Sequence, residues 1–241
     1  NGPPRPSREG RIRAAEPAFK FYMDPNFPPD TYQDPDVREM LETVDIITPG
    51  TDYCYQQYGQ VAVDFYDQFR AKGKIMGFYV CAQNPSEAES TRYYRLQQWA
   101  CWQINGGGPE SWTGFWAYSD TRGNPPWNQL AGGNDRNWSM VYIDSKSVTD
   151  GKHWLAIFEG VNDYEYLLTL KNRIAEARKA GRNDEAVAAA EKLLAELPDE
   201  VIAAVRGGNP PIHDGFIGTI KLGDIDACDT ARIRILDALK S

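Results

Sequence analysis

The chain has 241 residues, a net charge of −8, a pI near 4.9, and an aromatic content that includes 7 Trp and 13 Tyr. This acidic balance argues against nucleic acid or an anionic membrane surface as a partner. The length allows one large domain or two small ones, and without a run of 18 apolar residues no membrane span is predicted.

Four cysteines and two histidines limit the metal and thiol chemistry of the chain. Cys54, Cys81, Cys101 and Cys228 are widely spaced, and no Cys-x-x-Cys pair occurs. A zinc site and a histidine-based catalytic triad are therefore not expected, and we predict neither a metal nor another cofactor. The thiols are expected to be buried, and the question of one disulfide among them stays open.

In the first half of the chain, apolar strands alternate with amphipathic helices. A helix is predicted to end at residue 16, before Pro17. Strands are predicted over residues 19–23, 44–48, 75–81 and 114–118, with helices over 36–42, 60–71 and 90–103 between them. This alternation is typical of a parallel sheet with helical crossovers, so we predict an α/β fold.

The second half is mainly helical in its pattern. One more short strand is predicted over residues 138–143. Asn162 and Glu165 have the spacing of a capping box, which predicts a helix that begins there and continues to Gly181. Further helices are predicted from about residue 184 to 197, where Pro198 ends the helix, then to residue 205, and over 227–239, with a linker at 207–211.

Four parallel strands amount to half of an eight-stranded barrel. A full barrel needs on the order of 250 residues, and this chain has used its four strands by residue 118. A half-barrel would leave two unpaired edges, which proteins normally avoid. Two arrangements stay open: a missing N-terminal segment or a partner chain completes the barrel, or the sheet is open and doubly wound.

A family resemblance favours the barrel. The run from Glu159 to Leu168, centred on Asp-Tyr-Glu-Tyr-Leu at 163–167, resembles a signature near the end of the catalytic domain of glycoside hydrolase family 123. Other landmarks occur in the order that the family has them. Residues 45–49 resemble its sixth strand, and residues 77–81 its seventh. Residues 99–102 resemble the helix before its eighth strand, residues 114–118 the eighth strand, and residues 124–128 its Pro-Trp loop. The resemblance covers roughly residues 11–180.

The resemblance implies the second half (strands 5–8) of a TIM-type (β/α)8 barrel, followed by a C-terminal helical extension. Residues 1–160 would form the half-barrel, with four parallel strands and long loops on the active-site side. Residues 161–241 would form helices packed on the barrel. The tyrosines of the 163–167 run are expected to be structural and to hold helix and barrel together.

The resemblance also implies a function. In hexosaminidases that use substrate assistance, the sugar's acetamido oxygen attacks, an Asp orients it and a Glu is the general acid. That Asp-Glu pair belongs to the family's fourth strand, so we expect it on a missing N-terminal segment or a partner chain and assign no catalytic residue here. The implied function is a glycoside hydrolase-like protein acting on an N-acetylated glycan, located outside the cell, in a periplasm or on the cell surface. The alternative is a non-catalytic glycan-binding or surface-assembly protein on the same fold.

Residues near the carboxyl ends of the predicted strands are the candidates for binding carbohydrate, because barrels place their chemistry there. The predicted set is Asp24, Tyr79, Gln83, Asn84, Trp116, Tyr118, Asp120 and Trp127. Trp127 is the best stacking platform, since an aromatic ring matches the C–H face of a sugar. Other roles stay open: Asp24 as the cap of a turn, Tyr79, Gln83 and Asn84 as parts of a turn, and Trp116 in the core.

Overall fold

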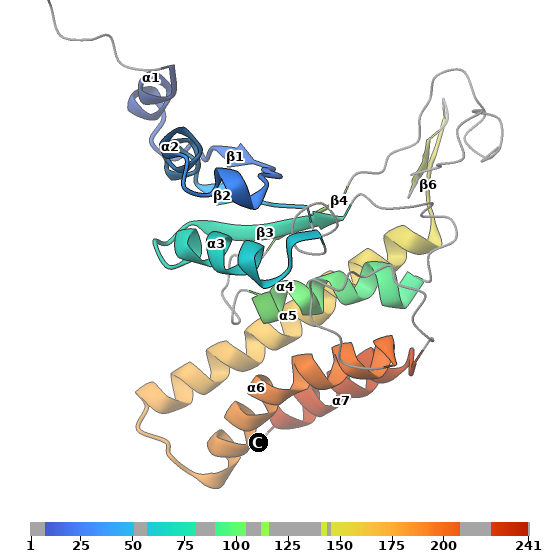
Figure 1. The fold of residues 1–241 in the computed structure, drawn as a ribbon. Helices are drawn as coiled ribbons and strands as arrows, with labels where there is room; N and C mark the ends of the chain where they lie inside the picture. Colours follow the sequence, from blue (N-terminus) through green and yellow to red (C-terminus); the bar gives the residue numbers. More distant parts are fainter. Residues whose placement is uncertain are drawn as a thin grey trace, which may run out of the picture.

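The computed structural model describes residues 8–50, 57–80, 90–104, 112–115, 141–143, 146–207 and 223–240. The first half contains α1 (Arg8–Ala15), β1 (Tyr22–Met23), a 3-10 turn (Pro29–Thr31), α2 (Pro35–Thr43), β2 (Ile46–Ile47), α3 (Gln60–Arg70), β3 (Ile75–Val80), a π-helical segment (Ser90–Arg95), α4 (Leu96–Ile104) and β4 (Trp112–Phe115). The second half contains β5 (Val141–Ile143), β6 (Val148–Asp150), α5 (Lys152–Lys179), α6 (Glu185–Arg206) and α7 (Ala227–Ala238) (Figure 1).

The strands β1 to β4 form one parallel sheet, and their order in the sheet is their order in the sequence. β1 pairs with β2, β2 with β3 and β3 with β4. Each strand predicted in the first half is present, although β1 and β2 are only two residues long. The predicted parallel α/β arrangement is therefore confirmed.

The two faces of this sheet have different surroundings. Ile47 pairs with Met76, while Tyr22, Ile46 and Ile75 form the neighbouring row, whose side chains point to the opposite face. Ile47 and Met76 lie in the hydrophobic core with side chains of α2, α3 and α4. Ile46 and Ile75 are half-buried, and Tyr22 is 39% exposed. We call the face that carries Ile47 and Met76 the helix face, and the face that carries Ile46 and Ile75 the open face.

The helix α4 is buried over most of its length. Every residue from Tyr94 to Trp102 is buried, and α4 contacts β4 as well as α5 and α6. The side chains of Leu96, Trp99 and Cys101 are at most 1% exposed, and Gln97 and Gln98 are buried with them. The helices α5, α6 and α7 pack together on the far side of α4 from the sheet (Figure 1).

The predicted start of a helix at Asn162 is wrong. The helix α5 begins at Lys152 and passes through Asn162 without interruption. Buried residues such as Ile157 and Gly160 occupy its first turns, so packing extends the helix about three turns beyond the local capping pattern. The strand predicted over 138–143 is present at its end as β5, which pairs antiparallel with β6, a strand that was not predicted.

The prediction that Pro198 ends a helix is also wrong. Pro198 is buried inside α6, which continues to Arg206 and ends at Gly207 in the left-handed conformation (φ 67°). A proline in a helix interior costs about 3 kcal/mol. The burial of Leu197 and Val201 on either side of it offsets this cost, because each buried side chain of this size contributes about 1.5–3 kcal/mol.

Two of the four cysteines lie in the described residues. Cys101 and Cys228 are both buried. Burial raises the pKa of Cys101 well above its ordinary value and that of Cys228 to about 12, so neither thiol ionises at neutral pH. This agrees with the predicted buried thiols, while Cys54 and Cys81 lie outside the described residues.

Asp45 connects three elements at the amino ends of the strands. Its carboxylate accepts hydrogen bonds from the Phe21 N–H (2.8 Å) and from the Arg13 guanidinium, whose closest ion-pair distance is 3.0 Å. Burial acts to raise the pKa of Asp45, but the hydrogen bonds from Phe21 and Arg13 outweigh it and hold the pKa below its ordinary value. Asp45 therefore stabilises the fold in its ionised form.

We expect Asp45→Asn to lower the free energy of unfolding by about 2 kcal/mol at pH 7. Because the folded-state pKa is lowered, the wild-type contribution is present above the unfolded-state pKa of about 4 and is lost as the pH falls through the folded-state value. Urea denaturation between pH 7 and pH 2 should show the two proteins converging below pH 4. Glu39→Gln, at an exposed position of α2, is the control. A difference that persists undiminished at pH 2 would contradict this role.

Candidate functional site

Polar side chains from three strands meet at the carboxyl ends of the parallel sheet. Asn26, just after β1, accepts a hydrogen bond from the Gly50 N–H through its side-chain oxygen (3.0 Å). Its side-chain nitrogen donates to the hydroxyl of Tyr79, which lies in β3. Tyr79 is 6% exposed and, four residues after Ile75, belongs to the open face.

Gly50 makes the contact between Asn26 and Tyr79 possible. A Cβ atom at residue 50 would lie 2.9 Å from the Asn26 Oδ1 and 3.1 Å from the Tyr79 Cζ. The first distance is shorter than real Cβ atoms show, and the second is tighter than most Cβ contacts. The backbone after β2 therefore approaches these two residues as closely as a glycine allows.

Three further polar residues, Tyr22, Asp24 and Thr48, belong to the same end of the sheet. Thr48 is fully buried. Burial and the charge of Asp24 raise the pKa of Tyr22 while the nearby Thr48 hydroxyl lowers it, and the net shift is upward. We call Tyr22, Asp24, Asn26, Thr48 and Tyr79 the carboxyl-edge cluster.

Two of the eight predicted carbohydrate-binding residues can be placed. Asp24 and Tyr79 both lie in the carboxyl-edge cluster, Asp24 exposed and Tyr79 buried. The other six lie outside the described residues: Gln83, Asn84, Trp116, Tyr118, Asp120 and Trp127. Sequence reasoning missed Asn26 and Thr48, although their position within three residues of a predicted strand end was a usable signal.

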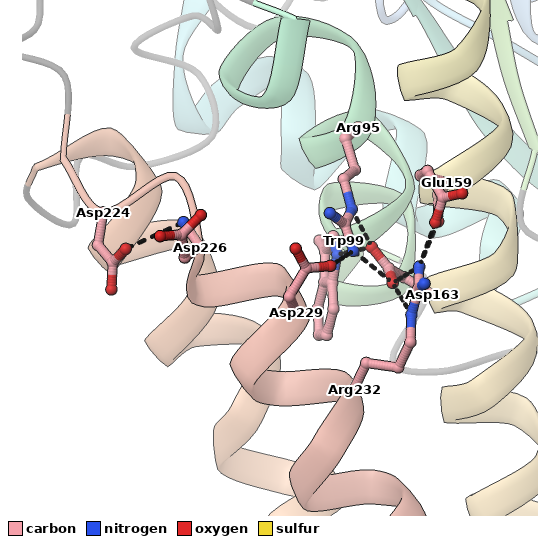
Figure 2. Close-up of polar contacts among 8 residues, drawn as sticks. All are labelled: Arg95, Trp99, Glu159, Asp163, Asp224, Asp226, Asp229 and Arg232. Atoms are coloured by element: carbon pink, nitrogen blue, oxygen red, sulfur yellow. Dashed lines mark hydrogen bonds and ion pairs between the residues drawn. The ribbon is translucent and has the colours of Figure 1, made fainter.

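A second polar group lies in the helical part and is centred on the buried carboxylate of Asp163. Asp163 on α5 is 1% exposed. It accepts hydrogen bonds from the Arg95 Nε (2.7 Å), the Trp99 Nε1 (3.1 Å) and the Arg232 Nε (3.0 Å), as Figure 2 shows. The carboxylate thus joins the π-helical segment, α4, α5 and α7, and we call this group the Asp163 cluster.

Two outer carboxylates, Asp229 and Glu159, extend the Asp163 cluster. Arg95 also donates to Asp229 (2.8 Å), and Arg232 also donates to Glu159 (2.8 Å) (Figure 2). Burial acts to lower the pKa of Arg95, but the hydrogen bonds that Arg95 donates to Asp163 and Asp229 outweigh it and raise that pKa. Both arginines are therefore charged, and they face three carboxylates. This arrangement links the π-helical segment, α5 and α7 through side-chain contacts.

Much of the run that resembles the hydrolase signature is explained by packing. A Cβ atom at Gly160 would lie 2.6 Å from the Arg95 carbonyl oxygen, so glycine allows α5 to approach the π-helical segment. Tyr164 packs edge-on against Trp102, with ring centroids 5.0 Å apart. The Arg232 guanidinium lies over the ring of Tyr166, 5.4 Å from its centroid. These contacts agree with the structural role expected for the two tyrosines.

Other classes of site find no support in the described residues. No group of three or more His, Cys, Asp or Glu side chains among them is placed to hold a metal ion. Within the same residues, no helix combines the length and apolar character that a bilayer crossing requires.

The fold and the carboxyl-edge cluster define a mixed α/β protein with polar groups at the carboxyl ends of a parallel sheet. The sequence matches no known protein family and no curated protein.

Proposed function

We propose that this chain is the second half of a TIM-type (β/α)8 barrel and acts on an N-acetylated glycan as part of a glycoside hydrolase-like protein. The observation that carries the proposal is the carboxyl-edge cluster on a parallel sheet whose strands follow sequence order. Barrels place their chemistry at this end of the strands. The resemblance of residues 159–168 to the hydrolase signature supports the same reading.

The sheet supports a barrel over a doubly wound arrangement. In a doubly wound sheet the strand order reverses at a switch point and helices cover both faces. In a barrel the strands follow sequence order and the helices lie outside. Among the described strands β1 to β4 no reversal occurs, and core side chains such as Ile47 and Met76 lie on the helix face. The half-buried Ile46 and Ile75 mark the open face that further strands would cover.

The carboxyl-edge cluster supplies the kind of groups that bind a sugar. Its amide, two phenols and one alcohol exchange hydrogen bonds with sugar hydroxyl and acetamido groups. In the described part of the cluster Asp24 is the one carboxylate, so it does not supply the Asp-Glu pair of substrate-assisted hydrolysis. We assign that pair to a segment upstream of this chain or to a partner chain.

The test is hydrolysis of aryl N-acetylhexosaminides by this chain joined to, or co-expressed with, the first half of the barrel. We expect turnover by the completed barrel, and a decrease of about tenfold in kcat/KM for Trp127→Ala, which corresponds to about 1.4 kcal/mol. Phe19→Ala is the control, because Phe19 lies just before β1, at the opposite end of the sheet.

A non-catalytic glycan-binding protein on the same fold is the second candidate. It is favoured by the single carboxylate in the described part of the carboxyl-edge cluster. A completed barrel that binds N-acetylhexosamines but does not hydrolyse their aryl glycosides would favour this candidate. A completed barrel that neither binds nor hydrolyses them would contradict both.

A further inference from the structure

We propose that the outer side of α5 is an interface through which two copies of this chain associate, with the two α5 helices antiparallel about a twofold axis. The interface is formed by Trp154, Leu155, Phe158 and Val161, which we call the α5 stripe. The inference goes beyond the proposed function and does not depend on it, because it concerns the outside of the helical part rather than the carboxyl ends of the strands.

The α5 stripe is exposed although the opposite side of the same helix is packed. Its four side chains are between 38% and 56% exposed. The other side of α5 buries residues such as Ile157 and Leu167 and contacts α4, α6 and α7. A surface helix normally turns charged and polar residues to the solvent. A group of adjacent apolar side chains on that side marks an interaction surface.

The spacing of the α5 stripe indicates that its partner is another helix. Phe158 follows Trp154 by four residues, Val161 follows Phe158 by three, and Glu165 follows Val161 by four. With 3.6 residues per turn, these four positions lie within about 60° of one another around the helix axis. Alternating spacings of four and three are those of the a and d positions in a coiled-coil seam. The stripe is therefore suited to a helix that lies along α5.

The exposed area of the α5 stripe is of the size that a second copy would need. Taking about 150–250 Å² for each whole side chain, the exposed fractions correspond to roughly 350 Å² of apolar surface. One side of a standard protein interface buries about 800 Å², of which somewhat more than half is apolar. The stripe supplies most of that apolar part, and in a twofold pair the other copy supplies the same surface.

Charges on α5 favour the antiparallel direction. Glu165 is exposed and continues the line of the stripe. The first turn of α5 contains Lys152 and no acidic residue, and Gly151 provides no side-chain cap, so the positive end of the helix dipole has no acidic complement within that turn. With a twofold axis between Phe158 and Val161, each Glu165 lies beside the first turn of the other α5. A parallel pair would instead bring the two Glu165 carboxylates together, which is unfavourable.

The experiment is sedimentation velocity of the 241-residue chain over a range of concentrations. We expect a species of twice the chain mass of 27.1 kDa, with a Kd on the order of 10 µM. At about 0.15 M salt the Debye length is about 8 Å, so repulsion between two chains of net charge −8 is largely screened. Phe158→Ser should raise the Kd at least about tenfold. Ile233→Ser is the matched control, because Ile233 on α7 is 60% exposed and lies outside the stripe. Circular dichroism checks that each variant is folded.

A second variant tests the direction of the pair. Glu165→Gln should raise the Kd about threefold or more, because two equivalent contacts with a helix N-terminus are lost. In a parallel pair the same substitution would lower the Kd, since it removes a repulsion between like charges. Glu176→Gln is the control, because Glu176 is exposed on the same side of α5 about three turns further along.

Three outcomes would overturn the inference. A chain that stays monomeric at the highest concentration would show that the α5 stripe serves a different occupant, such as a segment upstream of this chain. A dimer that Ile233→Ser dissociates and Phe158→Ser does not would place the interface on α7. A lower Kd for Glu165→Gln would exclude the antiparallel pair. None of these results bears on glycan hydrolysis or binding, which the proposed function tests separately.

Discussion

Replacing Asp163 by Asn is expected to lower the free energy of unfolding by about 3–5 kcal/mol. The substitution keeps the shape of the side chain but removes the charge that faces Arg95 and Arg232. The Asp163 side chain is 0% exposed and that of Arg95 is 9% exposed, so water cannot replace the lost carboxylate. Guanidinium denaturation of both proteins at pH 7 measures the effect.

The matched control for this prediction is Asp229→Asn. Asp229 also binds Arg95, but its side chain is 61% exposed, and exposed ion pairs contribute about 0–1 kcal/mol. A loss below about 1 kcal/mol in both variants would show that Asp163 is not the centre of the cluster. Equal and large losses would show that the outer carboxylate is as important as the buried one.

Gly160→Ala is expected to destabilise the protein by about 1–3 kcal/mol. Alanine is the better helix former by about 1 kcal/mol, so helix propensity alone predicts the opposite sign. The clash decides the result, because the new Cβ atom would lie 2.6 Å from the Arg95 carbonyl oxygen, which belongs to the backbone. Gly160→Ser should be more destabilising still. Thermal and urea denaturation give the ranking.

Gly181→Ala is the control for crowding at glycine. No atom lies within 4 Å of a Cβ built at Gly181, but its φ of +80° is in the left-handed region. We expect a cost of about 1–2 kcal/mol there from backbone strain alone, and no further loss for Ser. A Gly160→Ala protein as stable as the wild type would contradict the close approach of α5 to the π-helical segment.

The part of the fold that follows from local patterns could be predicted from the sequence. Strand and helix periods are properties of neighbouring residues, and the sheet of β1 to β4 and the helices α2, α3 and α7 lie close to where those periods place them. The errors at Asn162 and Pro198 have a common cause. In both places a local stop or start signal of a few kcal/mol is outweighed by burial against distant elements.

The polar sites, like the fold, include one part that local patterns predict and one part that they do not. The position of Asp24 and Tyr79 at the carboxyl ends of the strands could be predicted, because the ends of parallel strands meet at one edge, while their predicted role in carbohydrate binding stays a prediction. The Asp163 cluster could not be predicted, because Arg95 and Arg232 lie 68 and 69 residues from Asp163 in the sequence. No periodicity connects residues at such separations, and the sequence pattern contains no signal for the pairing.

The position of α4 between the sheet and the C-terminal helices has a consequence for dividing the molecule. A fragment that stopped before α5 would leave the Trp99 and Trp102 side of α4 in water, since α5 and α6 cover it. Such a fragment would expose a contiguous aromatic surface of the kind that drives aggregation. The sheet and the C-terminal helices therefore share one interior, and expression trials should keep residues 8–240 together.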